Sequence, residues 1–444
     1  MKIAALLRSA ALVSAVALLP VTTAGLAAVE GRAAPQFGKL FATYQRIKAS
    51  YVDEVEDEVL VRGAIEGMLA ALDPHSTYLD GASLQRLETM IDGNYSGLGL
   101  SVTTSDGAVK VISPMRGSPA EKAGVKAGDY ITHLDGQLIY GLELDEAVSR
   151  MRGEAGTDIR LTIFRPGRDE PFDVTVTRGV ITLEPVTSDL KPGRVGLITV
   201  NEFSRNVGKN VNDAIKELRR KAGGKLTGIV LDLRSNPGGS LDEAVALSDL
   251  FLSDGVIVSQ RGRIKRENAV YNAETVYKGD AAAGIPMVVL IDAGSASASE
   301  IVAGALQDRH RALVMGERSF GKGSVQTLLP LTRDSAIKLT TARYYTPGGR
   351  SVQEGGIEPD ITVPQLSDPD RVARAKLRYR ESDLRRHLVN EVNLDDRELE
   401  ADTKQDPRFA ATPEELKKQG IEDFQLHYAL ETLRRTNGAQ LTAK

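Results

Sequence analysis

Cysteine and tryptophan are both absent from this 444-residue sequence, and aromatic residues make up only 5% of it. Without cysteine the chain has no disulfides, no thiol nucleophile and no thiolate ligands for a metal. The scarcity of aromatic residues argues against stacking surfaces for single-stranded nucleic acid. The formal net charge is only −4, which indicates no basic surface. We therefore expect no nucleic-acid partner.

A long apolar run occurs only at the N-terminus, where Ser9–Pro20 follows the basic residues Lys2 and Arg8. Small residues dominate positions 24–28, and this order of basic, apolar and small segments is typical of a signal peptide. We therefore predict a signal peptide over residues 1–28 and an exported, periplasmic protein with no stable membrane span after cleavage. Because the run is shorter than the roughly 20 residues of a spanning helix, an uncleaved membrane anchor remains only as the alternative.

Residues 29–92 are predicted to form an N-terminal helical region with the first part of a cap on the α/β core of residues 179–364. Apolar residues recur at helical spacing between Phe37 and Leu72, in two stripes separated by the acidic stretch Asp53–Glu58. This pattern predicts two amphipathic helices, the second ending at Asp73-Pro74. Periodicity alone leaves open whether they pack on their own chain or on a second copy.

Residues 93–178 change to short strands and glycine-rich turns, a texture typical of a small mixed domain that folds alone. The expected strands are Leu98–Val102, Val109–Ile112, Ile159–Phe164 and Phe172–Val176. Ser118-Pro119 predicts a helix start, because serine is a favoured N-cap and proline suits the first helical position. A second short helix is expected over Leu144–Met151.

Residues 179–364 alternate buried-type strands with helical segments, which predicts an α/β core. The expected strands are Val195–Val200, Gly228–Leu233, Met287–Asp292, Ala312–Met315 and Ile337–Tyr345. The expected helices are Val207–Leu218, Leu241–Phe251 and Ile301–Leu306. Residues 365–444 form a charged C-terminal region with a terminal helix over Phe424–Leu433.

Two small-residue segments that follow predicted strands carry residues capable of chemistry. Ser297 lies in a run of serine and alanine after the strand ending at Asp292, with Glu300 three residues later. This spacing is that of a capping box, so Ser297 is either a helix N-cap or a nucleophile at a helix start. The two roles are compatible, because a helix N-terminus favours developing negative charge.

A serine nucleophile needs a base, and none of the five histidines is indicated for that role. His310 is nearest in sequence, but it would lie ~20 Å along the helix that Ser297 begins. Lys322, flanked by Gly321 and Gly323, is the leading candidate. A buried lysine can lose its proton near neutral pH and then act as the base.

Two other glycine-rich segments have competing interpretations. Gly316–Lys322 matches most of a phosphate-binding P-loop, but Gly323 stands where a Mg²⁺-binding serine or threonine belongs and the following residues look extended. Asn236-Pro237-Gly238-Gly239 is either a plain turn or a source of backbone N–H groups for an oxyanion.

Taken together, seven motifs in order resemble the carboxyl-terminal processing proteases, also called tail-specific proteases. The resemblance runs from about Phe37 to Pro364. Its motifs are Leu72-Asp73-Pro74-His75-Ser76, Gly97-Leu98-Gly99, Ser118-Pro119-Ala120, Asp232-Leu233-Arg234 with Asn236-Pro237-Gly238-Gly239, Ser295-Ala296-Ser297-Ala298-Ser299-Glu300, Phe320-Gly321-Lys322-Gly323 and Tyr345-Thr346-Pro347-Gly348-Gly349-Arg350.

The resemblance implies a multi-domain α/β (α+β) protein with a crotonase-like serine protease core into which a PDZ domain is inserted. It implies Ser297 as nucleophile, Lys322 as base and Gln326 as the residue that orients Lys322. Backbone N–H groups of Ala298 and of one of the two glycines, Gly238 or Gly239, would form the oxyanion hole. The family needs no metal or other cofactor.

The resemblance also implies the role of the region 93–178. A PDZ domain presents the N–H groups of its Gly97–Leu100 loop (Gly97, Leu98, Gly99 and Leu100) to a substrate's terminal carboxylate. The expected partners are protein or peptide substrates bound by their C-terminal tails, an activating adaptor protein and further copies of the chain. The alternative function is a PDZ adaptor that binds exported protein tails without cutting them.

Overall fold

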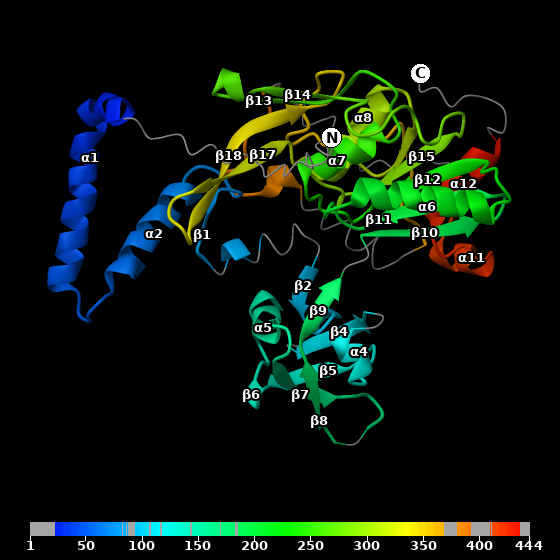
Figure 1. Ribbon diagram of the computed structural model, residues 1–444. Helices are drawn as coiled ribbons and strands as arrows, with labels where there is room; N and C mark the ends of the chain where they lie inside the picture. The colour runs from blue at the N-terminus through cyan, green and yellow to red at the C-terminus, as the bar shows by residue number, and fades with distance from the viewer. Residues whose placement is uncertain are drawn as a thin grey trace, which may run out of the picture. The chain divides into compact units, whose positions relative to one another are not determined.

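The computed structural model describes residues 23–435, apart from 82, 86, 88–93, 106–107, 116–117, 143, 169, 183–184, 368–379, 392–408 and 410 (Figure 1). Most of the predicted signal peptide lies outside the described residues. The chain divides between Met68 and Leu69 into two compact units, and each is described by itself. Among the residues just defined, no helix is both long enough and apolar enough to cross a membrane.

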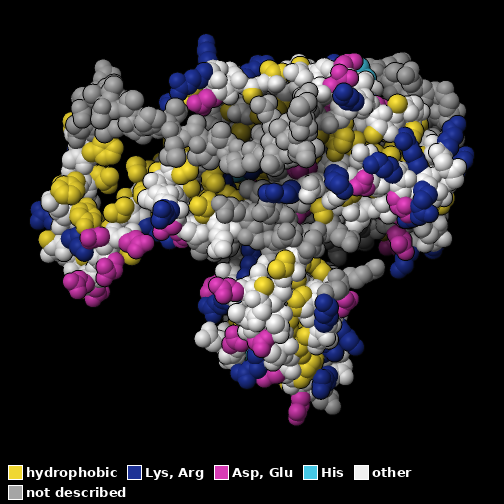
Figure 2. All heavy atoms as spheres, viewed as in Figure 1, with side chains coloured by type: hydrophobic (Ala, Val, Ile, Leu, Met, Phe, Trp, Pro, Cys, Tyr) yellow, Lys and Arg dark blue, Asp and Glu magenta, His cyan; other side chains and the backbone are white. Residues whose placement is uncertain are grey.

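The N-terminal unit consists of α1 (Thr23–Ser50) and most of α2 (Asp57–Ala70). The two predicted helices are confirmed, but the first begins well before Phe37. Its early turns are rich in alanine, a strong helix former that leaves no amphipathic stripe to detect. Figure 2 shows apolar side chains gathered on these helices. The apolar residues of this unit that are more than half exposed include Phe37 and Phe41 on α1, Tyr51 and Val52 in the loop after it, and Val59 and Val61 on α2.

The region predicted as a PDZ domain contains one antiparallel sheet in the order β3-β4-β5-β7-β8. Its elements are β3 (Leu100–Ser105), β4 (Ala108–Pro114), α4 (Pro119–Lys122), β5 (Tyr130–Leu134), β6 (Gln137–Leu138, paired with β5), α5 (Leu144–Met151), β7 (Asp158–Phe164) and β8 (Phe172–Thr177). The predicted strands and helices are confirmed, except that the first strand begins at Leu100, after Leu98-Gly99, which belong to no strand. Ser118 caps α4 by accepting from the N–H of Glu121. Strands β5 and β6 were not predicted. A separate pair joins β2 (Asn94–Gly97) to β9 (Gly179–Thr182).

The α/β core is built on a six-stranded sheet in the order β10-β11-β12-β15-β16-β19. Its strands are β10 (Val186–Lys191), β11 (Val195–Val200), β12 (Gly228–Asp232), β15 (Met287–Ile291), β16 (Leu313–Gly316) and β19 (Ile361–Thr362). Strand β10 is antiparallel to β11, and the other neighbours are parallel. The four predicted strands of this sheet are confirmed within one residue.

Helices cover both faces of this sheet, which explains its unbroken apolar strands. Ile229 and Leu231 of β12 belong to the core shared with α6 (Val207–Lys221), α7 (Leu241–Asp249) and α8 (Ala298–Asp308). Val230, between them, faces the opposite core, to which α12 (Phe424–Arg435) contributes Ala429 and Leu433. The short α11 (Pro413–Lys418) begins at the capping box of Thr412.

A second sheet brings the remaining site segments together. It is antiparallel, in the order β1-β18-β13-β14. Strand β17 also pairs with β18, outside this order. Its strands are β1 (Thr77–Leu79), β13 (Val256–Gly262), β14 (Ala269–Asn272), β17 (Ser324–Pro330) and β18 (Ala336–Tyr345). Because β1 pairs with β18, the predicted cap segment after residue 72 packs with this sheet. Two single 3₁₀ turns, η1 (Lys265–Glu267) and η2 (Glu381–Asp383), complete the described elements.

Candidate active site

The predicted site residues follow three adjacent strands of the core sheet. The Asn236–Gly239 turn follows β12, Ser297 follows β15 and Lys322 follows β16. These strands are neighbours and parallel, so their carboxyl ends lie at one edge. In open α/β sheets ligands bind beyond the carboxyl ends of the strands. The topology therefore brings together segments that lie far apart in the sequence.

Buried Asn236 joins the first loop to the second. Its carbonyl accepts from the Ala296 N–H (3.0 Å) and from the Ser299 hydroxyl (2.9 Å). Its side-chain amide donates to the Val200 carbonyl (2.8 Å) and accepts from the Gly238 N–H (2.9 Å). The turn is thus held rigidly against the segment that carries Ser297.

Gly238 lies directly against the predicted nucleophile. A β-carbon placed on Gly238 would stand 2.9 Å from the Ser297 β-carbon and 2.7 Å from the Ala296 carbonyl oxygen, so only glycine fits. The Gly238 N–H is engaged by Asn236, whereas the N–H groups of Gly239 and Ala298 donate to no group in the described part of the chain. Gly238 and the Ala298 N–H therefore lie beside Ser297, and which glycine donates stays a prediction.

Ser297 sits at a sharp, strained turn between β15 and α8. Its φ is 55° and its ψ is −110°, a conformation that serine rarely adopts. Strained strand-to-helix turns expose the nucleophile in other hydrolases, and such strain persists only where the surroundings enforce it. Ser297 is also the N-cap of α8, as the alternative interpretation predicted.

Glu300 holds the backbones of both predicted catalytic residues. One carboxylate oxygen, Oε2, accepts from the N–H groups of Ser297 (2.7 Å) and Lys322 (3.0 Å). The other, Oε1, accepts from the Gly321 N–H (2.7 Å) and the Ser319 hydroxyl (2.6 Å). The side chain is fully buried, and this burial raises the pKa of Glu300 to about 7, while the donated hydrogen bonds oppose the rise. The sequence marked Glu300 only as a capping residue.

Tyr344 is a second link between the predicted pair, and the sequence carried no signal for it. Its hydroxyl donates to the Lys322 carbonyl and interacts with the Ser297 side chain. Burial raises the pKa of Tyr344 well above its ordinary value, so the phenol stays neutral.

Lys322 lies in an environment that favours its neutral form. Burial lowers the pKa of Lys322, and the positive charge of Lys338 lowers it further. Three carboxylates, those of Glu381, Glu300 and Asp73, act in the opposite direction. The direction of the net shift is the one that a lysine base requires.

Gln326 lies on β17, the strand that follows the Lys322 loop. Its amide donates to the Ser324 hydroxyl (2.9 Å) and the Thr340 hydroxyl (3.2 Å), and Thr340 in turn donates to Asp73 (3.1 Å). Its predicted role in orienting Lys322 stays a prediction.

A cavity of 670 Å³ adjoins Asp73 and Thr340. Its remaining lining residues are Leu72, Arg261–Arg263, Thr341–Arg343, Tyr345, Leu388 and Glu391.

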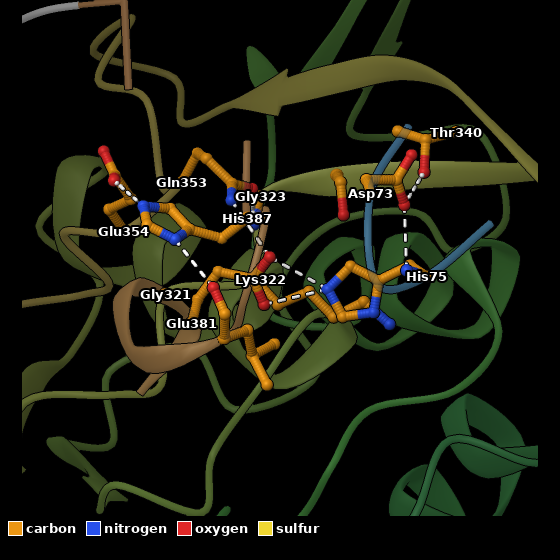
Figure 3. Close-up of polar contacts among 12 residues, drawn as sticks. Asp73, His75, Gly321, Lys322, Gly323, Thr340, Gln353, Glu354, Glu381 and His387 are labelled. Carbon is orange, nitrogen blue, oxygen red and sulfur yellow. Dashed lines mark hydrogen bonds and ion pairs between the residues drawn. The ribbon is translucent and has the colours of Figure 1, made fainter. Parts of the chain in front are cut away.

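A histidine of the first family motif and a glutamate outside all the motifs flank the Lys322 loop. His75 contacts both carboxylate oxygens of Glu381 through Nε2, at 2.8 and 2.9 Å. Figure 3 shows this pair on one side of the loop and the His387–Glu354 pair on the other. The sequence alone could not reveal the His75–Glu381 contact, since its two residues are 306 positions apart.

The P-loop alternative is wrong. A P-loop leads into a helix whose N-terminus binds phosphate, whereas the residues after Gly323 form β17. The loop geometry is set by close backbone approaches instead. A β-carbon on Gly321 would meet the Glu354 carbonyl oxygen at 2.7 Å, and one on Gly323 would meet the Gln353 nitrogen at 2.4 Å.

The predicted carboxylate-binding loop, Gly97–Leu100, connects β2 to β3. Gly99 has a φ of 71°, and a β-carbon there would stand 2.4 Å from the Ser118 β-carbon. The carbonyls of Leu98 and Gly99 accept from the N–H groups of Ala120 and Met115. Strand β3 is at the edge of its sheet, where an extended peptide can add as a further strand.

Three family models match the chain in the order of its regions. The model of peptidase family S41 matches residues 194–363, which contain the core sheet and the candidate site. The PDZ domain model matches residues 110–165. The model of the N-terminal domain of the activating protease CtpB matches residues 21–83.

Characterised proteins resemble the chain over most of its length. It is 41% identical over 361 residues to the carboxy-terminal-processing protease of Bartonella bacilliformis, covering 81% of each chain. It is 35% identical over 349 residues to the carboxy-terminal processing protease CtpA of Bacillus subtilis, covering 78% of this chain and 72% of that one. The photosystem II D1 C-terminal processing protease aligns with 30% identity and a TM-score of 0.48, over 79% of this chain and 92% of that chain. Because it is 41% identical to the Bartonella protease over 81% of each chain, the chain belongs to the S41 family of carboxy-terminal processing serine proteases, with a PDZ domain.

Proposed function

We propose that Ser297 and Lys322 form the catalytic dyad of an exported endopeptidase that cleaves proteins near their C-termini. The observation that carries this proposal is the shared carboxylate oxygen of Glu300, which accepts from the N–H groups of both residues. A single buried acid thus keeps the two residues in one fixed relation. Such preorganisation is what nucleophile and base need.

The proposed reaction begins when neutral Lys322 takes the Ser297 proton as Ser297 attacks the scissile carbonyl. The developing oxyanion is stabilised by the N–H group of Ala298 and that of Gly238 or Gly239. An acyl-enzyme forms as the leaving amine takes a proton from Lys322, which then activates the hydrolytic water. Gln326 is proposed to orient Lys322, directly or after a change of its present partners, Ser324 and Thr340.

Cleavage of a fluorogenic peptide by Ser297→Ala and Lys322→Ala variants tests the dyad. Each substitution is expected to lower kcat by about a thousandfold or more. A fluorophosphonate probe should label Ser297 in the wild type and fail to label either variant. Unchanged cleavage by the Ser297→Ala variant would refute the assignment, and tail binding without any wild-type cleavage would favour the non-catalytic PDZ adaptor.

The PDZ domain is proposed to grip the C-terminal tail of the substrate along the free edge of β3, with the terminal carboxylate at Gly97–Leu100. It is further proposed to gate the active site, with an adaptor protein as the activator. Deletion of residues 93–178 raises the steady-state rate on an untailed peptide if the domain inhibits. A fall in rate on tailed substrates alone would assign it to recruitment, and no change on either substrate would refute both roles.

Export and self-association complete the proposal. The N-terminal pattern over residues 1–28 supports a cleaved signal peptide and a periplasmic location, and the mature N-terminus determined after fractionation tests both. The exposed apolar side chains of α1 and α2 support assembly with further copies of the chain. Light scattering of the mature protein at several concentrations tests that assembly.

A further inference from the structure

Glu381 is a fully buried carboxylate that no step of the proposed reaction uses. It lies on η2, and its side chain has no exposed surface. Besides the contacts with His75 Nε2, its Oε1 accepts from the Gln353 amide at 3.1 Å. A buried carboxylate is costly unless it is hydrogen-bonded and its charge is balanced, so this placement needs a reason.

The contacts of Glu381 converge on both sides of Lys322. Its own N–H donates to the carbonyl of Phe320 (3.2 Å), before the lysine. Its side chain reaches Gly323, after the lysine, through Gln353, whose Oε1 accepts from the Gly323 N–H at 3.1 Å. The glutamate therefore fixes the loop at two points that bracket the proposed base.

His75 ties a third segment to the same point. It precedes β1, and its backbone N–H donates to Asp73 at 2.8 Å, which orients the turn that presents the imidazole. Figure 3 shows the imidazole and the Glu381 carboxylate meeting beside the Lys322 loop. Segments from the beginning, middle and end of the protease thus meet around one lysine.

We propose that His75 and Glu381 are positioning residues for Lys322, which fix its loop and place a charge-balanced pair beside its amine. This inference rests on the proposed function of Lys322 as the base. Neither residue touches the substrate in this proposal. Both act through the lysine.

The charges around Lys322 explain why a pair is needed. The groups acting on it are Lys338 from β18, Glu300 from α8, Asp73 from the turn before β1 and Glu381 from η2, with Glu381 the strongest of the carboxylates. An uncompensated carboxylate there would favour the charged lysine, which cannot accept a proton. In the proposal, His75 acts on the lysine only through Glu381, by its direct contact with that carboxylate at 2.8 and 2.9 Å.

A second histidine–glutamate pair provides a matched control. His387 contacts Glu354 at 2.6 Å, and the backbone N–H of Glu354 donates to the Gly321 carbonyl at 2.8 Å. The control pair thus supports the same loop. Glu354 is absent from the charges that act on Lys322. Substitutions in this pair test loop support without the proposed electrostatic effect.

The experiment compares the pH dependence of kcat/KM for the variants Glu381→Gln and His75→Gln. Glu381→Gln removes the carboxylate charge and His75→Gln removes the imidazole, while each glutamine keeps a hydrogen-bonding group at the contact. The acid limb is the part of the profile in which kcat/KM falls as pH is lowered. Glu381→Gln should move it to lower pH, because the charged form of Lys322 loses the favourable carboxylate of Glu381. His75→Gln should move it to higher pH, because the Glu381 charge is no longer offset. Each shift should be about half a pH unit to one unit.

The double variant and the control pair sharpen the result. In the His75→Gln/Glu381→Gln variant the acid limb should return towards the wild-type position, which makes the two effects non-additive. Glu354→Gln and His387→Gln should leave the limb in place. Limbs that stay fixed in all the His75 and Glu381 variants, or that move equally in the control variants, would overturn the proposal.

A second measurement does not depend on turnover. In a Ser297→Ala background, mass spectrometry follows the rate at which an acetylating reagent modifies Lys322 at each pH. The midpoint of this curve of rate against pH should shift in the same direction as the acid limb of kcat/KM. If either single variant fails to fold, the other and the double variant still decide. An active Lys322→Ala enzyme would refute the dyad itself. An inactive one with unmoved midpoints would refute only the role of His75 and Glu381.

Discussion

The protease core and the PDZ domain are built on different kinds of sheet, one mostly parallel and the other antiparallel. The core sheet is mostly parallel and covered on both faces, so every residue of β12 is buried. The PDZ sheet is antiparallel, and β7 alternates between exposed and buried residues. Parallel strands end at one edge, where rigid loops assemble a catalytic group. In the antiparallel sheet, β3 has a partner on one side only among the described strands, and a peptide can add at the other side.

Of the substitutions that compare the two regions, Gly238→Ala should have the largest effect, and that effect should fall on catalysis by the core. The new β-carbon would collide with Ser297 and Ala296, and displacing a nucleophile by about 1 Å costs on the order of a hundredfold in kcat. Gly224→Ala is the control, because Gly224 has a similar φ, 98° against 103°, but no atom within 4 Å of the added β-carbon. Equal losses in the two variants would mean that backbone strain, and not the contact with Ser297, is responsible.

The pH dependence of stability should distinguish the core from the PDZ domain through Glu300. Burial raises the pKa of Glu300 from 4.5 to about 7, so the folded state holds its proton more tightly than the unfolded state. Its contribution to the free energy of unfolding is complete below pH 4.5 and is lost as pH rises through 7, by about 3 kcal/mol at most.

Urea unfolding between pH 4.5 and 8 measures this contribution. The transition of the core should show the loss, and Glu300→Gln should abolish it while lowering stability at every pH, because its amide would face N–H donors. A Glu300→Gln variant that retains the wild-type slope would contradict the assignment of the slope to this residue.

Gly99→Ala should have a smaller effect, confined to the PDZ domain. The collision with Ser118 would distort the Gly97–Leu100 loop and weaken binding of a tail peptide by about tenfold, or about 1.4 kcal/mol. Titration calorimetry measures the affinity, and cleavage of a short untailed peptide should not change. Gly141→Ala, at a φ of 81° with no atom near the new β-carbon, should bind the tail normally.

Exposed ion pairs should contribute little to the thermal stability of either region. Lys209–Asp213 on α6 (2.7 Å) and Glu146–Arg150 on α5 (2.6 Å) are both solvent-accessible pairs at helical spacing. Lys209→Ala and Glu146→Ala should therefore give no measurable shift in the thermal midpoint of either region. A clear shift in one region alone would show that its surface is coupled to its core.

Much of the fold could be predicted because local patterns dictate local structure. Continuous apolar runs predicted β11, β12, β15 and β16, and the capping residue Ser118 predicted the start of α4. Strands β5 and β6 were missed, since their mixed residues carry no clear alternation. The early start of α1 was missed because alanine has high helix propensity but no periodic pattern.

By itself, the sequence determined which residues are fit for the chemistry: a serine at a helix start, a lysine between glycines and a glycine turn after a strand. Only the tertiary structure decided that these meet, because adjacent parallel strands end at one edge. It also decided the partners that no spacing could reveal, such as Tyr344 beside Ser297 and His75 against Glu381. Such contacts join residues that are distant in the chain, and their energy comes from burial, which exists only once the chain has folded.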